Sequence, residues 1–130
     1  MRLAAWRRHR PPWSATDPPG QPSTTAVLAV GSSGHFSGIY HVHWEWPRFE
    51  TRTVSPRWWP WPRAASCEIL FDDVPAPAAI ATAWASITRG SGVKFAVTID
   101  AEVVEEGHFG HRGTLQWRMR LREWVAVETL

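Results

Sequence analysis

Tryptophan and arginine are concentrated in one stretch of the chain, residues 44–63, and these residue types are well suited to binding a ligand. Its members are Trp44, Trp46, Arg48, Arg52, Arg57, Trp58, Trp59, Trp61 and Arg63. Nucleic-acid bases stack on aromatic faces for about 1–3 kcal/mol each, and nearby guanidinium groups bind the phosphates. The stretch therefore predicts a binding site for single-stranded nucleic acid, with Phe109 as a further aromatic contact.

The same composition supports two other interpretations. Tryptophan and arginine are enriched at the energetic centres of protein–protein interfaces, so the stretch can equally bind a protein partner or build an assembly. Alternatively, the tryptophans of the proline-rich loop at 55–63 pack on the core of the domain itself, since neighbouring tryptophans are costly to leave in water. The first two interpretations make the chain a non-catalytic binding module, which is the function that we predict.

Four histidines form a second candidate site, for a metal ion. His41 and His43 share one face of a predicted strand, and His108 and His111 flank a predicted turn. Zinc needs about three or four ligands at about 2.0–2.3 Å, and the spacing does not bring the two pairs together. We therefore expect hydrogen-bonded or surface imidazoles, with no metal and no other cofactor. A metal site ligated by these histidines is the remaining alternative.

Catalytic patterns are weak in this sequence. The pair Asp72-Asp73 fits the cap of a helix, and Glu105-Glu106 fits the solvated shoulder of a turn. The serines lack the nucleophile-elbow pattern. Cys67 belongs to no redox motif and is expected as a thiol of the core. We therefore do not expect an enzyme.

Length and composition predict one domain, residues 25–130, preceded by a disordered basic tail, residues 1–24, rich in arginine and proline. Eight arginines against three acidic residues give residues 1–65 a charge of +5, whereas six basic against nine acidic residues give 66–130 a charge of −3. Attraction for a polyanion must therefore come from the first half. The single cysteine favours a reducing, cytoplasmic location, and no apolar run approaches the roughly 20 residues that span a bilayer.

The element that must position these residues is a hairpin between Val93 and Val127. Apolar residues occupy the odd positions of both arms, which predicts two strands with one buried face. Centring the turn 107–113 on Phe109 sets the register. The predicted opposite pairs are Val97 with Leu121, Ile99 with Met119, Ala101 with Trp117, and Asp100 with Arg118. Alternation fails at Glu123-Trp124, which predicts a β-bulge. Arg118, Arg120 and Arg122 are interpreted as a solvated strand face that acidic neighbours neutralise.

The remaining elements follow in order along the chain. Strands are predicted at 26–30, 38–46, 48–54 and 66–71, with a turn at 31–34. A helix capped by Asp72 or Asp73 follows, with Ile80, Trp84 and Ile87 as its inward stripe and Gly90 as its end. This order predicts a mostly β, α+β domain. It matches a small OB-like five-stranded barrel with one helix between strands 3 and 4, and a β-grasp-like sheet covered by a helix is the alternative.

Overall fold

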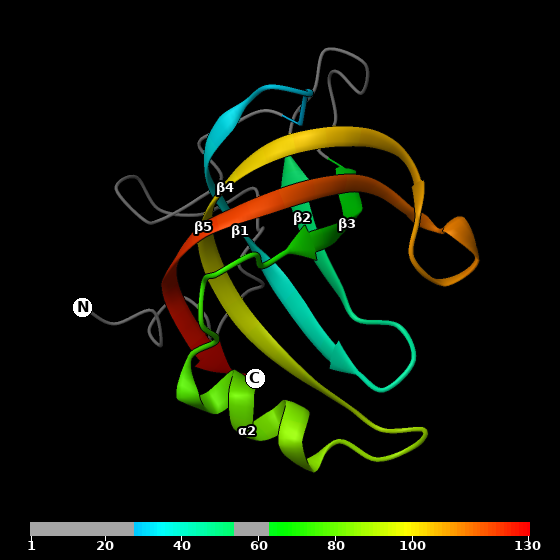
Figure 1. The fold of residues 1–130 in the computed structure, drawn as a ribbon, viewed down its shortest axis with the longest axis vertical. Coiled ribbons are helices and arrows are strands. Elements are labelled where there is room, and N and C mark those ends of the chain that lie inside the picture. The colour runs from blue at the N-terminus through cyan, green and yellow to red at the C-terminus, as the bar shows by residue number, and fades with distance from the viewer. Residues whose placement is uncertain (1–27, 54–62) are drawn as a thin grey trace.

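The computed structural model describes residues 28–53 and 63–130. In chain order its elements are β1 (Ser33–His43), β2 (Arg48–Thr53), β3 (Arg63–Leu70), α2 (Ala78–Ser86), β4 (Gly92–Phe109), the 3-10 turn η1 (His111–Gly113) and β5 (Leu115–Thr129) (Figure 1). The domain is mostly β with an α-helix between the third and fourth strands, as the sequence predicts. The predicted tail, residues 1–24, lies outside the described residues.

The five strands close into a ring in the order β1-β2-β3-β5-β4, and β4 pairs with β1 to complete it. Neighbours are antiparallel except β3 and β5, which run parallel from Cys67 opposite Trp117 to Leu70 opposite Arg120. β1 pairs with β2 on one side and with β4 on the other. Among the described strands, closure therefore leaves no long unpaired edge.

The hairpin of β4 and β5 has the buried face that alternation predicts. Its buried odd-numbered residues are Phe95, Val97, Ile99, Ala101, Val103, Leu115, Trp117, Met119 and Leu121. They pack with Phe36, Tyr40, Val42, Phe49 and Cys67 from the other strands. The period of two therefore identifies these interior residues correctly, but Ala96 and Thr98 on the other face of β4 are buried as well.

The predicted register of this hairpin is wrong. The observed opposite pairs are Val97 with Val127, Ile99 with Trp124, Ala101 with Leu121, and Asp100 with Glu123. The chain reverses after Phe109, at residues 110–114, where Gly110, Arg112 and Gly113 have positive φ. Register shifts along the pair also change which residues of β4 and β5 face each other. Two of these shifts lie beside the predicted bulge at Glu123-Trp124. Asp100 consequently does not face Arg118.

The first part of the described chain differs from the prediction. Residues 28–30 form a bend and turn rather than a strand, with Leu28 buried and Val30 59% exposed. Residues 26 and 27 lie outside the described residues. The strand predicted at 38–46 begins instead at Ser33 and ends at His43. The reason for the early end is the turn at 44–47, which the side chain of His43 holds.

Helix α2 lies across one end of the ring (Figure 1). Ile80 is fully buried and Trp84 packs against the core, as predicted. Ile87 also packs there, but it is the extended C-cap residue, so the helix ends at Ser86 and not at the predicted Gly90. The predicted cap is wrong, because the N-cap residue is Pro77 and makes no side-chain cap hydrogen bond. Asp72 instead has φ 49° in the preceding turn, and its carboxylate accepts a hydrogen bond from Arg120 at 2.9 Å. No helix in the described ranges is long and apolar enough to cross a bilayer.

Candidate functional site

Part of the tryptophan- and arginine-rich stretch is described. Trp44 and Trp46 lie in the loop between β1 and β2, and Arg48 begins β2. The backbones of Arg52 and Arg63 belong to β2 and β3. The side chains of those two arginines, together with Arg57, Trp58, Trp59 and Trp61, lie outside the described residues. The described part of the candidate site therefore consists of the loop 44–47 and the residues in contact with it.

The imidazole of His43 holds this loop. Its Nδ1 accepts hydrogen bonds from the backbone N–H of Glu45 at 3.1 Å and of Trp46 at 3.0 Å. Because Nδ1 accepts both bonds, it is the ring nitrogen without a proton in this arrangement. His43 is thus a positioning residue for the turn that presents Trp44, a role that the sequence analysis did not anticipate.

Trp44 presents an indole to solvent beside a cation. Its side chain is 38% exposed, and its ring lies 6.3 Å from the His43 ring at an interplanar angle of 29°. The Arg89 guanidinium lies 5.6 Å from the indole centroid. The backbone N–H of Trp44 donates to the carbonyl of Ser91 at 3.4 Å, which ties the loop to the segment after α2. Sequence reasoning missed Arg89, because it lies far along the chain from the tryptophan-rich stretch.

Trp46 and Arg48 are engaged with each other. The Arg48 guanidinium lies 4.0 Å from the centroid of the Trp46 ring, and its Nη1 donates to the Trp46 carbonyl at 3.2 Å. The Arg48 Nε is also 4.0 Å from a carboxylate oxygen of Glu50. One face of Trp46 is therefore covered by a cation, so Trp44 is the more accessible of the two for stacking.

His41 and His43, two of the candidate metal ligands, have different hydrogen-bond partners. His41 is buried on the outer face of β1 and donates through Nε2 to the Glu50 carboxylate, whereas His43 holds the turn. Burial, followed by the positive charge of Arg48, lowers the pKa of His41, and Glu50 acts in the opposite direction. His108 lies exposed near the tip of the β4–β5 hairpin, and the side chain of His111 is not described. In residues 28–53 and 63–130 no group of three or more potential ligands converges.

Phe109 ends β4, and a cation covers its ring. The Arg118 guanidinium lies 4.1 Å from the Phe109 centroid, and it also donates to Glu68 at 2.8 Å and to Glu105 at 2.9 Å. Arg120 pairs with Asp72, and Arg122 lies 3.8 Å from Glu102. The arginines of β5 are thus neutralised by acidic neighbours, as predicted, although the partner of Arg118 is not Asp100.

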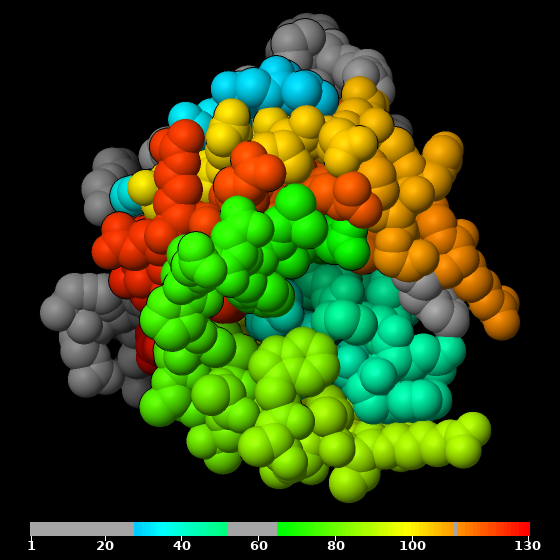
Figure 2. Space-filling model, viewed as in Figure 1, coloured from blue at the N-terminus to red at the C-terminus, as the bar shows by residue number. Residues whose placement is uncertain are grey.

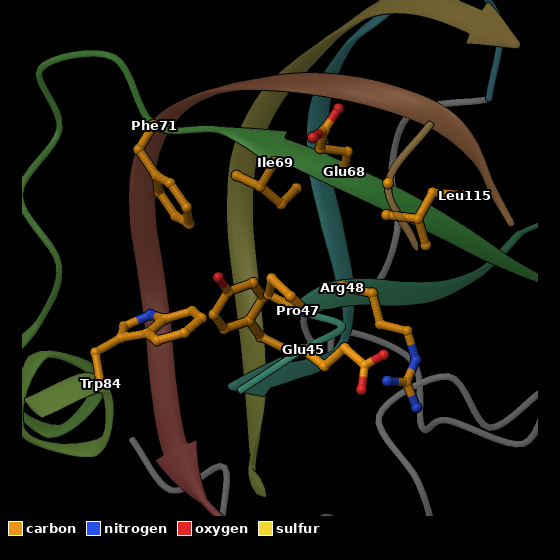
Figure 3. A pocket seen from close by; sticks show the side chains of 10 residues that line it. Glu45, Pro47, Arg48, Glu68, Ile69, Phe71, Trp84 and Leu115 are labelled. Carbon is orange, nitrogen blue, oxygen red and sulfur yellow. The ribbon is translucent and has the colours of Figure 1, made fainter. Parts of the chain in front are cut away.

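A pocket of about 210 Å³ opens at the end of the ring next to this loop. It is lined by Tyr40, Glu45, Pro47, Arg48, Glu68, Ile69, Phe71, Trp84, Gly110 and Leu115. Figure 2 shows its opening between β3, α2 and the β1–β2 loop. In Figure 3 the side chains of Trp84 and Phe71 lie on one side of it, and those of Glu45 and Arg48 on the other. The sequence analysis did not predict this pocket, because its walls come from segments far apart in the chain.

The aromatic floor of the pocket is firmly packed. The Tyr40 and Phe71 rings meet edge to face at 6.0 Å, and Phe71 stacks on Trp124 at 6.0 Å with an interplanar angle of 19°. Burial raises the pKa of the Tyr40 hydroxyl, although a hydrogen bond with Trp84 acts in the opposite direction. Tyr40 is therefore a neutral phenol at ordinary pH and not a reacting base. Cys67 is likewise fully buried, and burial raises the pKa of its thiol.

We use the name mouth surface for the pocket, the loop residues 44–48 and the hairpin residues 110–115 beside it, and the segment 88–91, which contacts Trp44. Comparisons of the chain with protein-family models, with curated proteins and with solved structures found no match. The chemistry of the mouth surface therefore has to be argued from its own residues.

Proposed function

We propose that this domain is a non-catalytic module that binds single-stranded nucleic acid at its mouth surface. The observation that carries the proposal is Trp44, a 38% exposed indole on a turn held by His43, with the Arg89 guanidinium beside it. An exposed aromatic face with an adjacent cation is the arrangement on which an unpaired base stacks while its phosphate is held. The preformed turn reduces the ordering cost of binding.

The ring is, in our proposal, OB-like. Supporting features are the closed order β1-β2-β3-β5-β4, the parallel pairing of β3 with β5, and the helix between β3 and β4. In OB folds the loops that follow the first and fourth strands bind oligonucleotides or oligosaccharides. The corresponding loops here, 44–47 and 110–114, both border the pocket. Because a fold alone does not give a function, the proposal rests on Trp44 and its neighbours.

Stacking rather than charge would dominate this binding. Across the described ranges nine basic residues stand against eleven acidic residues, a net charge of −2. The β5 arginines are paired with carboxylates. A strand bound at the mouth surface would therefore depend on aromatic contacts, supplemented by Arg48, Arg89 and the arginines of the segment 52–63.

A protein partner is the second candidate ligand. The observation that favours it is the net charge of −2 in the described residues, which weakly repels a polyanion but not a basic protein surface. Trp44 and Arg89 would then serve as anchors, since these residue types dominate binding energy at interfaces.

The test is fluorescence anisotropy of a labelled oligothymidylate with the Trp44→Ala variant. We expect its affinity to fall by about 5- to 150-fold, the equivalent of one lost stacking contact. Trp44→Phe should retain most of the affinity. Val125→Ala, which truncates another exposed apolar side chain at the other end of β5 from the pocket, is the matched control and should change nothing. An absence of binding by the unmodified chain would reject the proposal and leave the protein partner.

A further inference from the structure

The size and shape of the mouth pocket suit one planar ring system. Its volume of about 210 Å³ lies below the roughly 300–1,000 Å³ of sites for drug-sized ligands. Aromatic and aliphatic side chains form its depth, with Tyr40, Phe71 and Trp84 among them. A flat, weakly hydrated ring gains from burial against such walls, and Glu45 and Pro47 of the loop that carries Trp44 also line the pocket.

The charged rim of the pocket discriminates between ligand classes. Glu45, Glu68 and Arg48 all line it, so it offers acceptors and donors together. Two carboxylates repel a phosphate group, whereas the Arg48 guanidinium needs a hydrogen-bond acceptor, which an aliphatic ammonium ion does not carry. A neutral heterocycle whose edge carries both donors and acceptors suits all three groups, because it offers donors to the carboxylates and an acceptor to the guanidinium.

We infer that this pocket takes one unstacked guanine base of the strand bound at the mouth surface, an inference that rests on the proposed function. Guanine carries two adjacent donors, N1–H and the N2 amino group, that match a carboxylate such as Glu45 or Glu68. Its O6 and N7 acceptors match an arginine guanidinium, as in the commonest base-specific contact of proteins with DNA. No other common base offers that pair of donors next to that pair of acceptors.

Glu68 and Arg48 can each form further hydrogen bonds besides those that they already make. Oε1 of Glu68 accepts from Arg118 Nε at 2.8 Å, and a carboxylate can accept about four hydrogen bonds. Arg48 donates through Nη1 to the Trp46 carbonyl, and a guanidinium carries about five N–H donors. The backbone N–H of Glu45 donates to His43 Nδ1, so the loop that carries this carboxylate is held in place at the rim. The site is therefore partly preorganised for a base.

The experiment compares labelled oligothymidylates that carry a single central dG, dA, dC or dT, measured by anisotropy. One guanine per strand excludes four-stranded guanine structures within it. We expect the dG strand to bind about 5- to 150-fold tighter than the all-dT strand. In the double variant Glu45→Gln with Glu68→Gln the dG preference should be lost, so that the dG and all-dT strands bind this variant with equal affinity. Glu123→Gln, an exposed carboxylate that does not line the pocket, is the matched control and should retain the preference.

Four results would overturn the inference. If the dG and dT strands bind equally well, the pocket takes no guanine although the proposed function stands. The same conclusion holds if the dG preference survives in the folded double variant, as judged by its circular dichroism. If the double variant does not fold, the single variants Glu45→Gln and Glu68→Gln are measured separately, and the inference fails if neither weakens the preference. If no strand binds at all, the proposed function and the inference fail together.

Discussion

His41 and His43 are separated by one residue in β1, yet their rings have different partners. His41 lies within the strand, where its side chain meets Glu50 of the neighbouring strand. His43 ends the strand, so its ring is free to turn toward the N–H groups of the following loop. The spacing alone suggested a chelating pair. β1 ends at His43, whereas the sequence pattern predicted a strand that continues to residue 46. Because the strand ends there, the two imidazoles have different hydrogen-bond partners.

Protonation of His41 should destabilise the fold. Because burial and Arg48 lower its pKa in the folded state below the unfolded value of 6.5, the unfolded state binds more protons between the two values. The stability that this group contributes is fully present above about pH 6.5 and is lost as the pH falls through the folded pKa. The slope that it adds is at most about 1.4 kcal/mol per pH unit. Urea unfolding of the wild type and of His41→Gln between pH 5 and 8 measures it.

The difference between the two unfolding profiles isolates this residue from the other titrating groups. We expect the wild type to lose stability below pH 6.5 more steeply than His41→Gln. His108→Gln, which changes an exposed histidine near the hairpin tip, serves as the control and should follow the wild type. A profile of His41→Gln parallel to the wild type would contradict the lowered pKa.

At the scale of elements, local pattern predicted the faces of the hairpin but not its register. Alternation is a property of each strand by itself, so the buried positions of β4 and β5 follow from the sequence. Register depends on where the chain reverses and on each irregular pairing, and every such irregularity adds one residue to one side. A turn placed a few residues too early thus mispaired Ala101 with Trp117 instead of Leu121.

Engineered cysteine pairs can test the observed register. Glu102 and Arg120 face each other on the outer side of the hairpin. Opposite residues of antiparallel strands have Cα atoms about 4.5–5.5 Å apart, within the range that a disulfide spans. Mild oxidation of the double variant Glu102→Cys with Arg120→Cys should therefore leave only the buried Cys67 thiol, as counted with a thiol reagent after unfolding.

The control pair is Asp100→Cys with Arg118→Cys, which the register predicted from the sequence would place opposite each other. In the observed register Asp100 faces Glu123, so this second pair should remain reduced within the monomer. Ready cross-linking of the control pair, with none at residues 102 and 120, would reverse the assignment of the register.

At the scale of the whole molecule, the order of elements was predictable and the assembly of the site was not. Turn residues and periodicity along the chain correctly predict a helix that follows strands and precedes a final hairpin, but the first of the four strands predicted before the helix, at 26–30, is not a strand in residues 28–30. The parallel contact of β3 with β5 joins segments about fifty positions apart, and no local pattern encodes it. The pocket likewise takes Trp84 from α2 and Leu115 from β5. Sequence reasoning found Trp44, Trp46 and Arg48 because they are neighbours in the chain, and it missed Arg89 because that residue is not.

The uneven distribution of charge predicts the salt dependence of binding by the whole chain. We expect phosphate contacts from the arginines of the segment 44–63 in addition to stacking, because the β5 arginines are paired with carboxylates. Contacts from Arg48, Arg52, Arg57 and Arg63 give a slope of log affinity against log salt concentration near −2.8, at about −0.7 for each contact with a single strand. Anisotropy titrations over a series of salt concentrations measure this slope.

Arg57→Gln should reduce the slope by about 0.7, whereas Arg120→Gln, which removes the partner of Asp72, should leave it unchanged. An affinity that does not vary with salt would show that no phosphate is held, and the strand would have to bind through stacked bases alone.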